Sequence, residues 1–366
     1  MSLEQSERTR KALLEHCGRY PGLKIRDVFK FLYQSSFGCE HMVSSLDAVT
    51  DWIRKEHSGT VKGEAGSEVA GSGTVDPLDG GYSRVHLDWL DRGLSAETLG
   101  KLFYLSAKSE EDGRIELERK LDVALEMVRS GELPFDFEGF ASAVSQWKED
   151  DYPAVHHSEE FRAMYHPAYR VVAEQYVKFI PLFCEIDRRA GERFVVAIEG
   201  GSASGKTTLS QILSQVYDCT VFHMDDFFLR PEQRTPQRFA QPGGNVDRER
   251  FLEEVLEPLS RGEIVRYRRF DCSTFTLKEP VEVEPKQLVI VEGAYSMHPE
   301  LAGYYDFAVF LDVSPELQRD RIVKRNGPEM AKRFHNEWIP MEQLYFKGLN
   351  IKEQCDLVLP IEDYEL

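Results

Sequence analysis

The stretch from Arg193 to Tyr217 constrains the fold more than any other part of this sequence. An apolar run, RFVVAI, is followed by EGGSASGKTTLS and then by the helix-like QILSQVY. Gly200, Gly205 and Lys206, with the threonine that follows them, fit the pattern G-x-x-x-x-G-K-[ST]. Glycines at these two positions permit backbone torsions and a close approach that a Cβ would hinder. The order of strand, glycine-rich loop and helix therefore predicts a phosphate-binding loop.

The N–H groups of such a loop and the N-terminus of its helix are expected to point at the phosphates of a nucleotide. Lys206 would reach the β- and γ-phosphates, and the Thr207 hydroxyl would ligate Mg²⁺. The alternative is a small-residue turn that matches the pattern by chance. The pattern thus predicts ATP and Mg²⁺ as cofactors. The predicted nucleotide-binding residues are Gly200, Gly201, Ser202, Ala203, Ser204, Gly205, Lys206, Thr207 and Thr208.

The sequence after residue 193 has the residue pattern of an α/β domain. Short apolar runs, rich in β-branched residues, alternate with helical stretches such as TTLSQILSQVY and RERFLEEVLEPL. This alternation predicts a parallel sheet with helices on both faces. We place a domain boundary at about 190, so that 191–366 forms this P-loop domain. The predicted strands lie in FVVAIEGG, CTVFHMDD, QLVIVEGAY, FAVFLDV and CDLVLPI.

Residues 1–190 are expected to form a mainly α-helical domain. The stretches 23–37, 95–109 and 115–131 place apolar residues three and four positions apart. Ser95 suits a helix start and Gly131 a helix stop. The glycine- and serine-rich stretch 58–81 is expected to be a mobile loop within the helical region.

Several interpretations are open for three polar stretches of the helical region. These stretches are GCEHMV (38–43), YSRVHL (82–87) and 154–172. One is a pocket that binds a small anion or metabolite. Another is a metal site, although no H-x-x-x-H or H-E-x-x-H spacing occurs. The third is a set of ordinary amphipathic helices with buried tyrosines. The residues of the pocket interpretation are Arg84, Arg162, Arg170, His41, His86 and His157.

Composition and charge restrict the classes of partner. The chain has 366 residues, enough for two or three domains, and a formal net charge of -18, which argues against nucleic acid as a partner. No apolar run approaches the length of a membrane span, and the charged N-terminus does not resemble a secretory signal. The six cysteines form no C-x-x-C pair, which favours reduced thiols and a cytoplasmic protein. No feature indicates an oligomeric state.

Acidic residues follow two of the predicted strands. Asp225 and Asp226 come just after one strand, and Glu292 comes at the end of another. Ligands of open α/β sheets gather beyond the carboxyl ends of the strands. A carboxylate there can orient or deprotonate an acceptor hydroxyl, and another can hold Mg²⁺ through water. The alternative is that Asp226 caps a turn and Glu292 is merely solvated.

Several motifs in order resemble the uridine kinase family, within the wider group that includes pantothenate kinase and phosphoribulokinase. The loop GGSASGKTT is similar to that family's loop, and MDDFFL resembles its D-S-F-Y element. VIVEGAY matches its V-x-x-E-G element, and GGNVDRERF resembles N-F-D-x-P-x-A-F. RRFDCSTFTLKEPVEVEP resembles its Y-D-x-x-x-x-R stretch. The resemblance covers about 193–366, while residues 1–190 resemble no family of known activity.

The resemblance implies roles for individual residues. Asp225 corresponds to the general base, Asp247 to a residue that grips sugar hydroxyls, and Glu292 lies near the metal. RDRIVKRNG (319–327) occupies the place of the lid, whose arginines clamp the transferring phosphates. In this segment Arg321 and Arg325 are the candidates.

The sequence departs from the family pattern on the acceptor side. The family usually has a histidine after Y-D in the segment that recognises the pyrimidine, and FDCSTFTLKEP has none. The lid is also short. Arg266 and Arg268, together with Arg269, precede this segment and could hold an anionic substrate, or they could face solvent.

The sequence therefore predicts an ATP- and Mg²⁺-dependent kinase that transfers the γ-phosphoryl group to a hydroxyl of a small molecule, with uridine as the leading acceptor. One alternative is a kinase for a sugar acid or vitamin precursor. The other is a nucleotide-driven switch in which the helical half is the effector.

Overall fold

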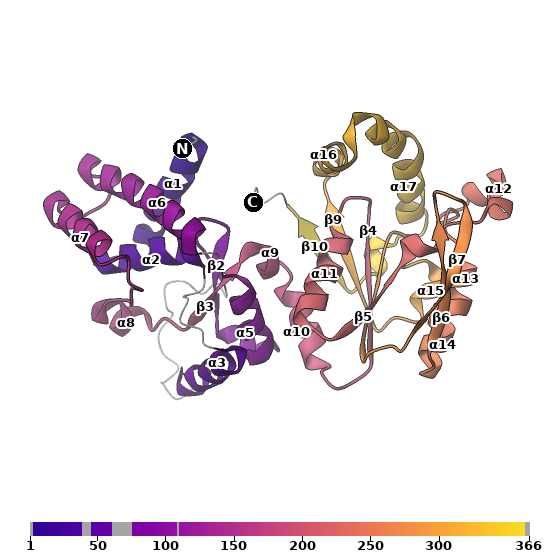
Figure 1. Cartoon of the computed structure of the whole chain (residues 1–366), viewed down its shortest axis with the longest axis horizontal. Helices are drawn as coiled ribbons and strands as arrows, with labels where there is room; N and C mark the ends of the chain where they lie inside the picture. The colour runs from indigo at the N-terminus through magenta and orange to yellow at the C-terminus, as the bar shows by residue number, and fades with distance from the viewer. Residues whose placement is uncertain (1–2, 39–44, 61–74, 108–109, 363–366) are drawn as a thin grey trace. The chain divides into compact units, whose positions relative to one another are not determined.

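The structure, a computed structural model, describes residues 3–38, 45–60, 75–107 and 110–362 (Figure 1). His41 and most of the stretch 58–81 lie outside the described residues. The chain divides into two compact units, one ending at Arg188 and the other starting at Arg189. None of the described helices is both long and apolar enough to cross a bilayer.

The N-terminal unit is mainly helical, as predicted. Ser95 caps α5, because its Oγ accepts a hydrogen bond from the Thr98 N–H at 3.0 Å. Gly131 follows α6 with a φ of 79°, a left-handed conformation that glycine adopts without strain. Both predicted helix signals are confirmed. The helices are α1 (Leu3–Arg19), α2 (Ile25–Phe37), α3 (Leu46–Thr60), α4 (Asp88–Asp91), α5 (Ala96–Leu105), α6 (Glu110–Ser130), α7 (Phe137–Glu149), α8 (Glu159–Tyr165), α9 (Glu174–Val177) and α10 (Ile180–Arg188).

A small antiparallel sheet, which the sequence did not reveal, also belongs to this unit. Its strands β1 (Val75–Pro77), β2 (Tyr82–His86) and β3 (Tyr169–Ala173) pair in that order. β2 and β3 are far apart in the chain, and each has only five residues. Strands this short give little periodicity, so their pairing depends on the packing of the helices between them.

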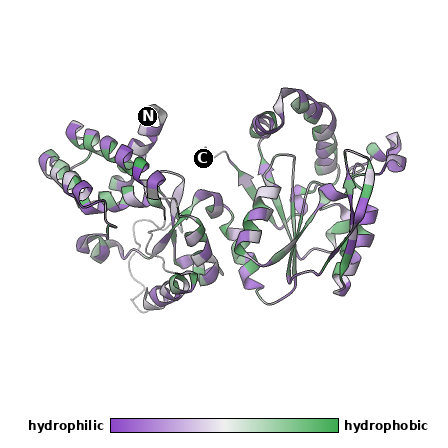
Figure 2. Cartoon of the chain, viewed as in Figure 1, coloured by the Kyte–Doolittle hydropathy of each residue, from purple (hydrophilic) through white to green (hydrophobic). Residues whose placement is uncertain are grey.

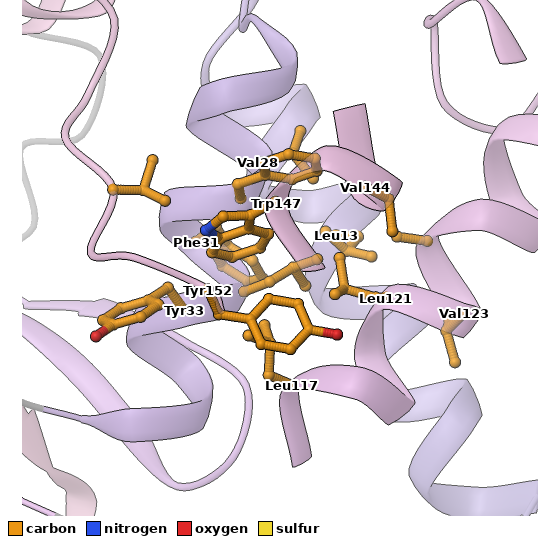
Figure 3. Close-up of a cluster of buried hydrophobic side chains, with 14 of the residues drawn as sticks. Leu13, Val28, Phe31, Tyr33, Leu117, Leu121, Val123, Val144, Trp147 and Tyr152 are labelled. Atoms are coloured by element: carbon orange, nitrogen blue, oxygen red, sulfur yellow. The ribbon is translucent and has the colours of Figure 1, made fainter. Parts of the chain in front are cut away.

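The core of the N-terminal unit lies where helices α1, α2, α6 and α7 meet. Figure 3 shows side chains from these helices converging, among them Leu13, Phe31, Leu121 and Trp147. Trp147 stacks on Phe29 with the ring centroids 4.6 Å apart. Burying such large aromatic side chains stabilises the helix packing by about 1.5–3 kcal/mol for each side chain.

The arginines of the predicted anion pocket do not converge. In the β2–β3 register Arg84 pairs with Val171 and Arg170 pairs with Val85, so the two arginines point to opposite faces of the sheet. Arg84 donates to Gln34 Oε1, whereas Arg170 pairs with Glu56. The third arginine, at position 162, is exposed on α8.

His157, by contrast, lies in a buried polar network. Its Nδ1 is 3.3 Å from Asp27 Oδ1 and its Nε2 is 2.5 Å from the Tyr169 hydroxyl. Asp27 also accepts hydrogen bonds from the N–H and the hydroxyl of Ser158. Burial lowers the pKa of His157 to about 4, although the hydrogen bond to Asp27 opposes this shift. The ring is therefore neutral at pH 7.

We expect acidification to destabilise the N-terminal unit through His157. Its pKa rises from about 4 in the folded chain to about 6.5 in the unfolded chain, so unfolding takes up a proton between these pH values. Stability is therefore lost as the pH falls through this window. His157→Gln should reduce the drop in melting temperature between pH 7 and pH 5. His156→Gln, at the exposed neighbouring position, should leave the drop unchanged, and equal drops in wild type and His157→Gln would contradict the neutral ring.

The C-terminal unit is built on a five-stranded sheet in the order β10-β9-β4-β8-β5, and every pairing in it is parallel. The strands are β4 (Phe194–Gly200), β5 (Cys219–His223), β8 (Leu288–Glu292), β9 (Phe307–Val313) and β10 (Leu357–Ile361). All five predicted strands are therefore confirmed. β4 and β8 are buried along their whole length, and Figure 2 shows hydrophobic residues along the strands.

Helices flank this sheet, and a separate two-stranded ribbon of β6 (Val265–Asp271) and β7 (Thr276–Val283) lies near α13 and α14 in Figure 1. The predicted helix RERFLEEVLEPL spans α13, η3 and α14 without a break. The helical segments are α11 (Lys206–Val216), η1 (Met224–Phe227), η2 (Pro231–Gln233), α12 (Pro236–Phe239), α13 (Arg248–Phe251), η3 (Leu252–Leu256), α14 (Glu257–Arg261), α15 (Pro299–Ala302), α16 (Pro315–Arg333), η4 (Phe334–Trp338), α17 (Ile339–Gly348) and η5 (Lys352–Gln354).

Candidate active site

The glycine-rich loop connects β4 to α11. Gly200 and Gly205 have φ values of 149° and 100°, and Ala203 is also left-handed at 60°. A Cβ on Gly200 would lie 2.8 Å from both the Leu311 carbonyl oxygen and Ser204 Oγ, so a side chain does not fit there. α11 begins at Lys206, directly after the turn. The backbone therefore has the strand–loop–helix form expected of an anion-binding loop.

The polar groups of the loop are close to one another. Lys206 Nζ donates to the carbonyl oxygens of Gly200 and Gly201 at 2.8 and 2.9 Å. Ser204 Oγ is buried and has no hydrogen-bond partner within the described part of the chain. Thr207 and Thr208 begin the exposed face of α11. A bound phosphate would give the Lys206 ammonium an anionic partner in place of two carbonyl dipoles.

Carboxylates lie at the neighbouring strand ends. The parallel register aligns Glu292, the last residue of β8, with His223 of β5 and with Ile198 of β4. Glu292 Oε1 is 2.6 Å from His223 Nδ1 and accepts a hydrogen bond from Thr207 Oγ1 at 3.2 Å. The hydrogen bond to Glu292 raises the pKa of His223. The structure thus brings together two residues that the sequence predicted, Thr207 and Glu292.

Asp225 and Asp226 lie in η1, immediately after β5. Asp225 is exposed, yet desolvation by the surrounding protein raises the pKa of its carboxylate. The Lys206 ammonium lowers this pKa, whereas the Glu292 and Asp226 carboxylates raise it further. Asp225 therefore lies within the electrostatic reach of Lys206 and Glu292.

The hydroxyl of Thr207 and the carboxylate of Glu292 suit Mg²⁺, which also takes ligands from substrate phosphates and water. They suit less well a metal ion that is held by protein side chains alone. No group of three or more His, Cys, Asp or Glu side chains in the described ranges is arranged to hold a metal ion. Mg²⁺ is commonly bound through one or two protein oxygens together with substrate phosphates and waters. The Thr207 hydroxyl and the Glu292 carboxylate, 3.2 Å apart, supply oxygens of this kind.

The two arginines predicted for the acceptor side pair with glutamates other than the acids at the strand ends. Arg266 forms an exposed ion pair with Glu282, and Arg268 lies 3.6 Å from Glu254. The next residue is the one that reaches the acids, since Arg269 Nε lies 3.4 Å from an oxygen of Asp226. The shift between Arg268 and Phe270 in the β6–β7 register is a bulge, which breaks the alternation of side chains along β6.

Asp247, to which the resemblance assigns the binding of sugar hydroxyls, is almost completely buried. It is 1% exposed, so little of it is accessible to a ligand. Its oxygens accept hydrogen bonds from Gln233 Nε2 at 2.9 Å and Arg250 Nε at 3.2 Å, and Arg230 Nε lies 3.5 Å away. The carboxylate is therefore already bound by side chains of the protein.

The two lid candidates have different surroundings. Arg321 of α16 contacts the loop, because its Nη1 donates to the Ala203 carbonyl oxygen at 3.4 Å. Arg325 is exposed and its Nε donates to Asn326 Oδ1. Gly327, with a φ of 77°, interrupts the helix just after these residues. The structure places Arg321, but not Arg325, against the phosphate-binding loop.

Two acids that the sequence analysis missed also contact the loop region. Glu342 of α17 accepts hydrogen bonds from the N–H and the hydroxyl of Ser202. Glu199 is fully buried at the end of β4 and accepts hydrogen bonds from the Met297 N–H and the Tyr345 hydroxyl. Burial raises the pKa of Glu199 to about 7. The available signal was an acid within an otherwise apolar run, as in WIPMEQLYF and VVAIEGG.

The parallel sheet, the loop at its centre and the acids at the neighbouring strand ends define a P-loop kinase domain. Residues 195–336 match the sequence model of the family described as Phosphoribulokinase / Uridine kinase family. The C-terminal unit is therefore similar to this family over most of its length. The matched residues all lie within this unit.

Individual relatives give the extent of the similarity. A uridine kinase of Brevibacillus brevis is 24% identical over 191 residues, which cover 48% of this chain and 87% of the relative. Uridine kinase-like protein 3 of Arabidopsis thaliana is 28% identical over 153 residues, and the match covers 39% of this chain and 32% of that protein. A solved structure of a possible uridine kinase from Bacillus stearothermophilus covers 51% of this chain and 99% of its own, at 22% identity and a TM-score of 0.41.

We expect Lys206→Ala to lower ADP release from MgATP by roughly 100-fold or more, because the loop loses the cation that would stabilise the transferring phosphate. Lys332→Ala, which removes an exposed lysine of α16, serves as the control and should retain activity. Circular dichroism would verify that both variants are folded. Undiminished ADP release by Lys206→Ala at saturating ATP would rule out this loop as the phosphate site.

Proposed function

We propose that this protein is an ATP- and Mg²⁺-dependent kinase that phosphorylates a hydroxyl group of a small molecule. The observation that carries the proposal is the position of Lys206 and Thr207 beside carboxylates at the ends of β5 and β8. The loop supplies an anion site, and the acids supply a base and oxygen ligands for a metal. This combination matches what phosphoryl transfer to a hydroxyl requires.

In the proposed reaction the acceptor oxygen attacks the γ-phosphorus as the bond from that phosphorus to the β–γ bridging oxygen breaks, and ADP leaves. Asp225 takes up the proton of the acceptor hydroxyl. The raised pKa of Asp225 suits this task, since a carboxylate with a higher pKa is a stronger base towards the acceptor proton. Lys206 stabilises the negative charge that spreads over the phosphoryl oxygens.

We assign the metal and lid roles from the same contacts. Thr207 and Glu292 would hold Mg²⁺, which neutralises phosphate charge when it is bound. Arg321 is the lid arginine that we favour, since it already contacts Ala203 of the loop. Arg325 would have to turn away from Asn326 to take part.

Asp247 is proposed to act indirectly. Its carboxylate fixes Gln233, Arg230 and Arg250, and the Arg250 guanidinium also donates to the Asp226 carbonyl oxygen. Asp247 would therefore position the segment that carries the catalytic acids. We further propose that residues 1–190 form a separate helical domain, and that residues 191–366 form the kinase domain.

We expect Asp225→Asn to lower kcat by about 10²–10⁴-fold with little change in the Kd for ATP, because the amide cannot take the proton. Asp226→Asn is the matched control, since this neighbouring acid is engaged by Arg269. Steady-state kinetics and nucleotide titration would measure both effects. A larger loss of kcat in Asp226→Asn would assign the base to Asp226.

The class of acceptor can be tested by measuring ADP release with a panel of uridine, cytidine and several sugars and hydroxy acids. We expect at least one polyhydroxylated compound to accelerate ADP release, and uridine is the leading candidate. The name of the Brevibacillus brevis relative supports uridine, whereas the absence of a histidine from FDCSTFTLKEP does not. Tight nucleotide binding without acceleration by any compound would contradict a kinase and favour a nucleotide-driven switch.

A further inference from the structure

His223 lies in the candidate site, but the proposed reaction gives it no role. It is the last residue of β5, and Glu292 is the last residue of β8. The two residues are direct partners in the parallel register of these strands, so their side chains lie on the same face of the sheet. The ring Nδ1 is 2.6 Å from Glu292 Oε1. The strand pairing itself therefore brings the imidazole and the carboxylate together.

The hydrogen bonds to Glu292 are uneven between its two oxygens. Oε1 accepts one hydrogen bond from His223 Nδ1 and another from Thr207 Oγ1, whereas Oε2 accepts none from the described residues. Each oxygen of a carboxylate offers about two acceptor positions. The Glu292 side chain also keeps 7% of its surface exposed. The two donors therefore occupy Oε1, and Oε2 remains available to a cation or to its water ligands.

His223 is the donor in its hydrogen bond with Glu292. An ionised carboxylate has no proton to donate, so ring Nδ1 carries the proton. The other ring nitrogen, Nε2, has no hydrogen-bond partner within the described ranges, and 38% of the side chain is exposed. The ring is thus anchored by a single hydrogen bond, and that bond goes to the carboxylate that we propose for the metal.

Thr207 alone would restrain this carboxylate less firmly. Its hydroxyl lies 3.2 Å from Oε1, which is longer than the usual O–H···O range of about 2.5–3.0 Å. The His223 hydrogen bond, at 2.6 Å, is short for an N–H donor. In addition, the Thr207 hydroxyl can rotate, whereas the position of His223 is set by the pairing of β5 with β8. His223 is therefore the stronger restraint on the rotation of the Glu292 carboxylate.

We propose that His223 is a positioning residue, which fixes the Glu292 carboxylate through Oε1 and so leaves Oε2 for the metal ion or its waters. The proposal rests on the proposed Mg²⁺-dependent kinase function. Hydrogen bonds from residues that do not touch a metal commonly orient the carboxylates that bind it, and losing such a residue typically weakens metal binding by about 10–100-fold. His223 would act on the metal site in this way, through Glu292.

The test measures the Kd for Mn²⁺ by electron paramagnetic resonance, with the full chain and a non-hydrolysable ATP analogue. Mn²⁺ is a suitable probe because, like Mg²⁺, it prefers oxygen ligands. We expect His223→Phe, which keeps a ring but lacks the donor, to weaken Mn²⁺ binding by about tenfold or more. His223→Asn should restore most of the affinity, because its amide nitrogen can donate from a position close to that of Nδ1.

Two further variants complete the design. His156→Phe changes an exposed histidine of the N-terminal unit, and it should leave Mn²⁺ binding unchanged. His223→Leu is a second variant without a donor, in case the phenylalanine ring prevents folding. The Kd for the ATP analogue without metal should be the same in all variants, because the phosphate-binding loop stays intact.

A purely structural role of His223 predicts different results. Equal Mn²⁺ affinity in the wild type and in the variants without a donor would overturn the proposal, even if their melting temperatures were lower. Equal losses of affinity in His223→Phe and His223→Asn would also overturn it, since the amide supplies a donor. A loss of metal-free analogue binding as large as the loss of Mn²⁺ binding would do the same, because the loop would then be the part that changed.

Failure of this proposal is distinguishable from failure of the kinase proposal. Mn²⁺ binding that depends on the ATP analogue but is insensitive to the His223 variants would overturn only the positioning role. Absence of Mn²⁺ binding by the wild type, with the analogue bound tightly, would overturn the Mg²⁺-dependent kinase and the role of His223 together.

Discussion

The parallel hydrogen bonding of β4 with both β8 and β9 is the constraint on which the C-terminal unit depends. It makes β4 the central strand, so the glycine-rich loop that follows β4 lies in the middle of the row formed by the carboxyl ends of the strands. The same pairing aligns the end of β8 with the end of β5, so that Glu292 meets both His223 and Thr207. Residues 69 and 85 positions apart become neighbours because the carboxyl ends of parallel strands lie on the same side of the sheet.

A second feature is the number of acidic side chains around a loop whose backbone has the form of an anion-binding site. Glu199 and Glu342 are buried beside this loop, while Asp225 and Glu292 lie at the strand ends next to it. Backbone N–H groups donate hydrogen bonds to Glu199 and Glu342, and the Tyr345 hydroxyl also donates to Glu199. These hydrogen bonds offset part of the free-energy cost of burying the two carboxylates. Such a site becomes electrostatically balanced only when cations, such as the Lys206 ammonium and a metal, oppose the acids.

The N-terminal unit shows where sequence reasoning succeeds and where it fails. Helices such as α2 and α6 were predictable because apolar residues repeat along one face over many turns, and Ser95 marked a helix start. The small sheet was not predictable, since β2 and β3 are short and more than eighty residues separate them. That sheet also decides that Arg84 and Arg170 face opposite ways, whereas the sequence alone allowed them to share a pocket.

By itself, the sequence determined the five parallel strands, the phosphate-binding loop and the acids at the ends of β5 and β8, because each depends on residues that are neighbours in the chain. Only the tertiary structure decided which distant side chains complete the site. It brought Glu342 onto Ser202 and buried Asp247 among arginines, and the bulge in β6 turned Arg269 toward Asp226. Local patterns encode strands and turns, but the packing of α17 and β6 against them fixes which charges meet.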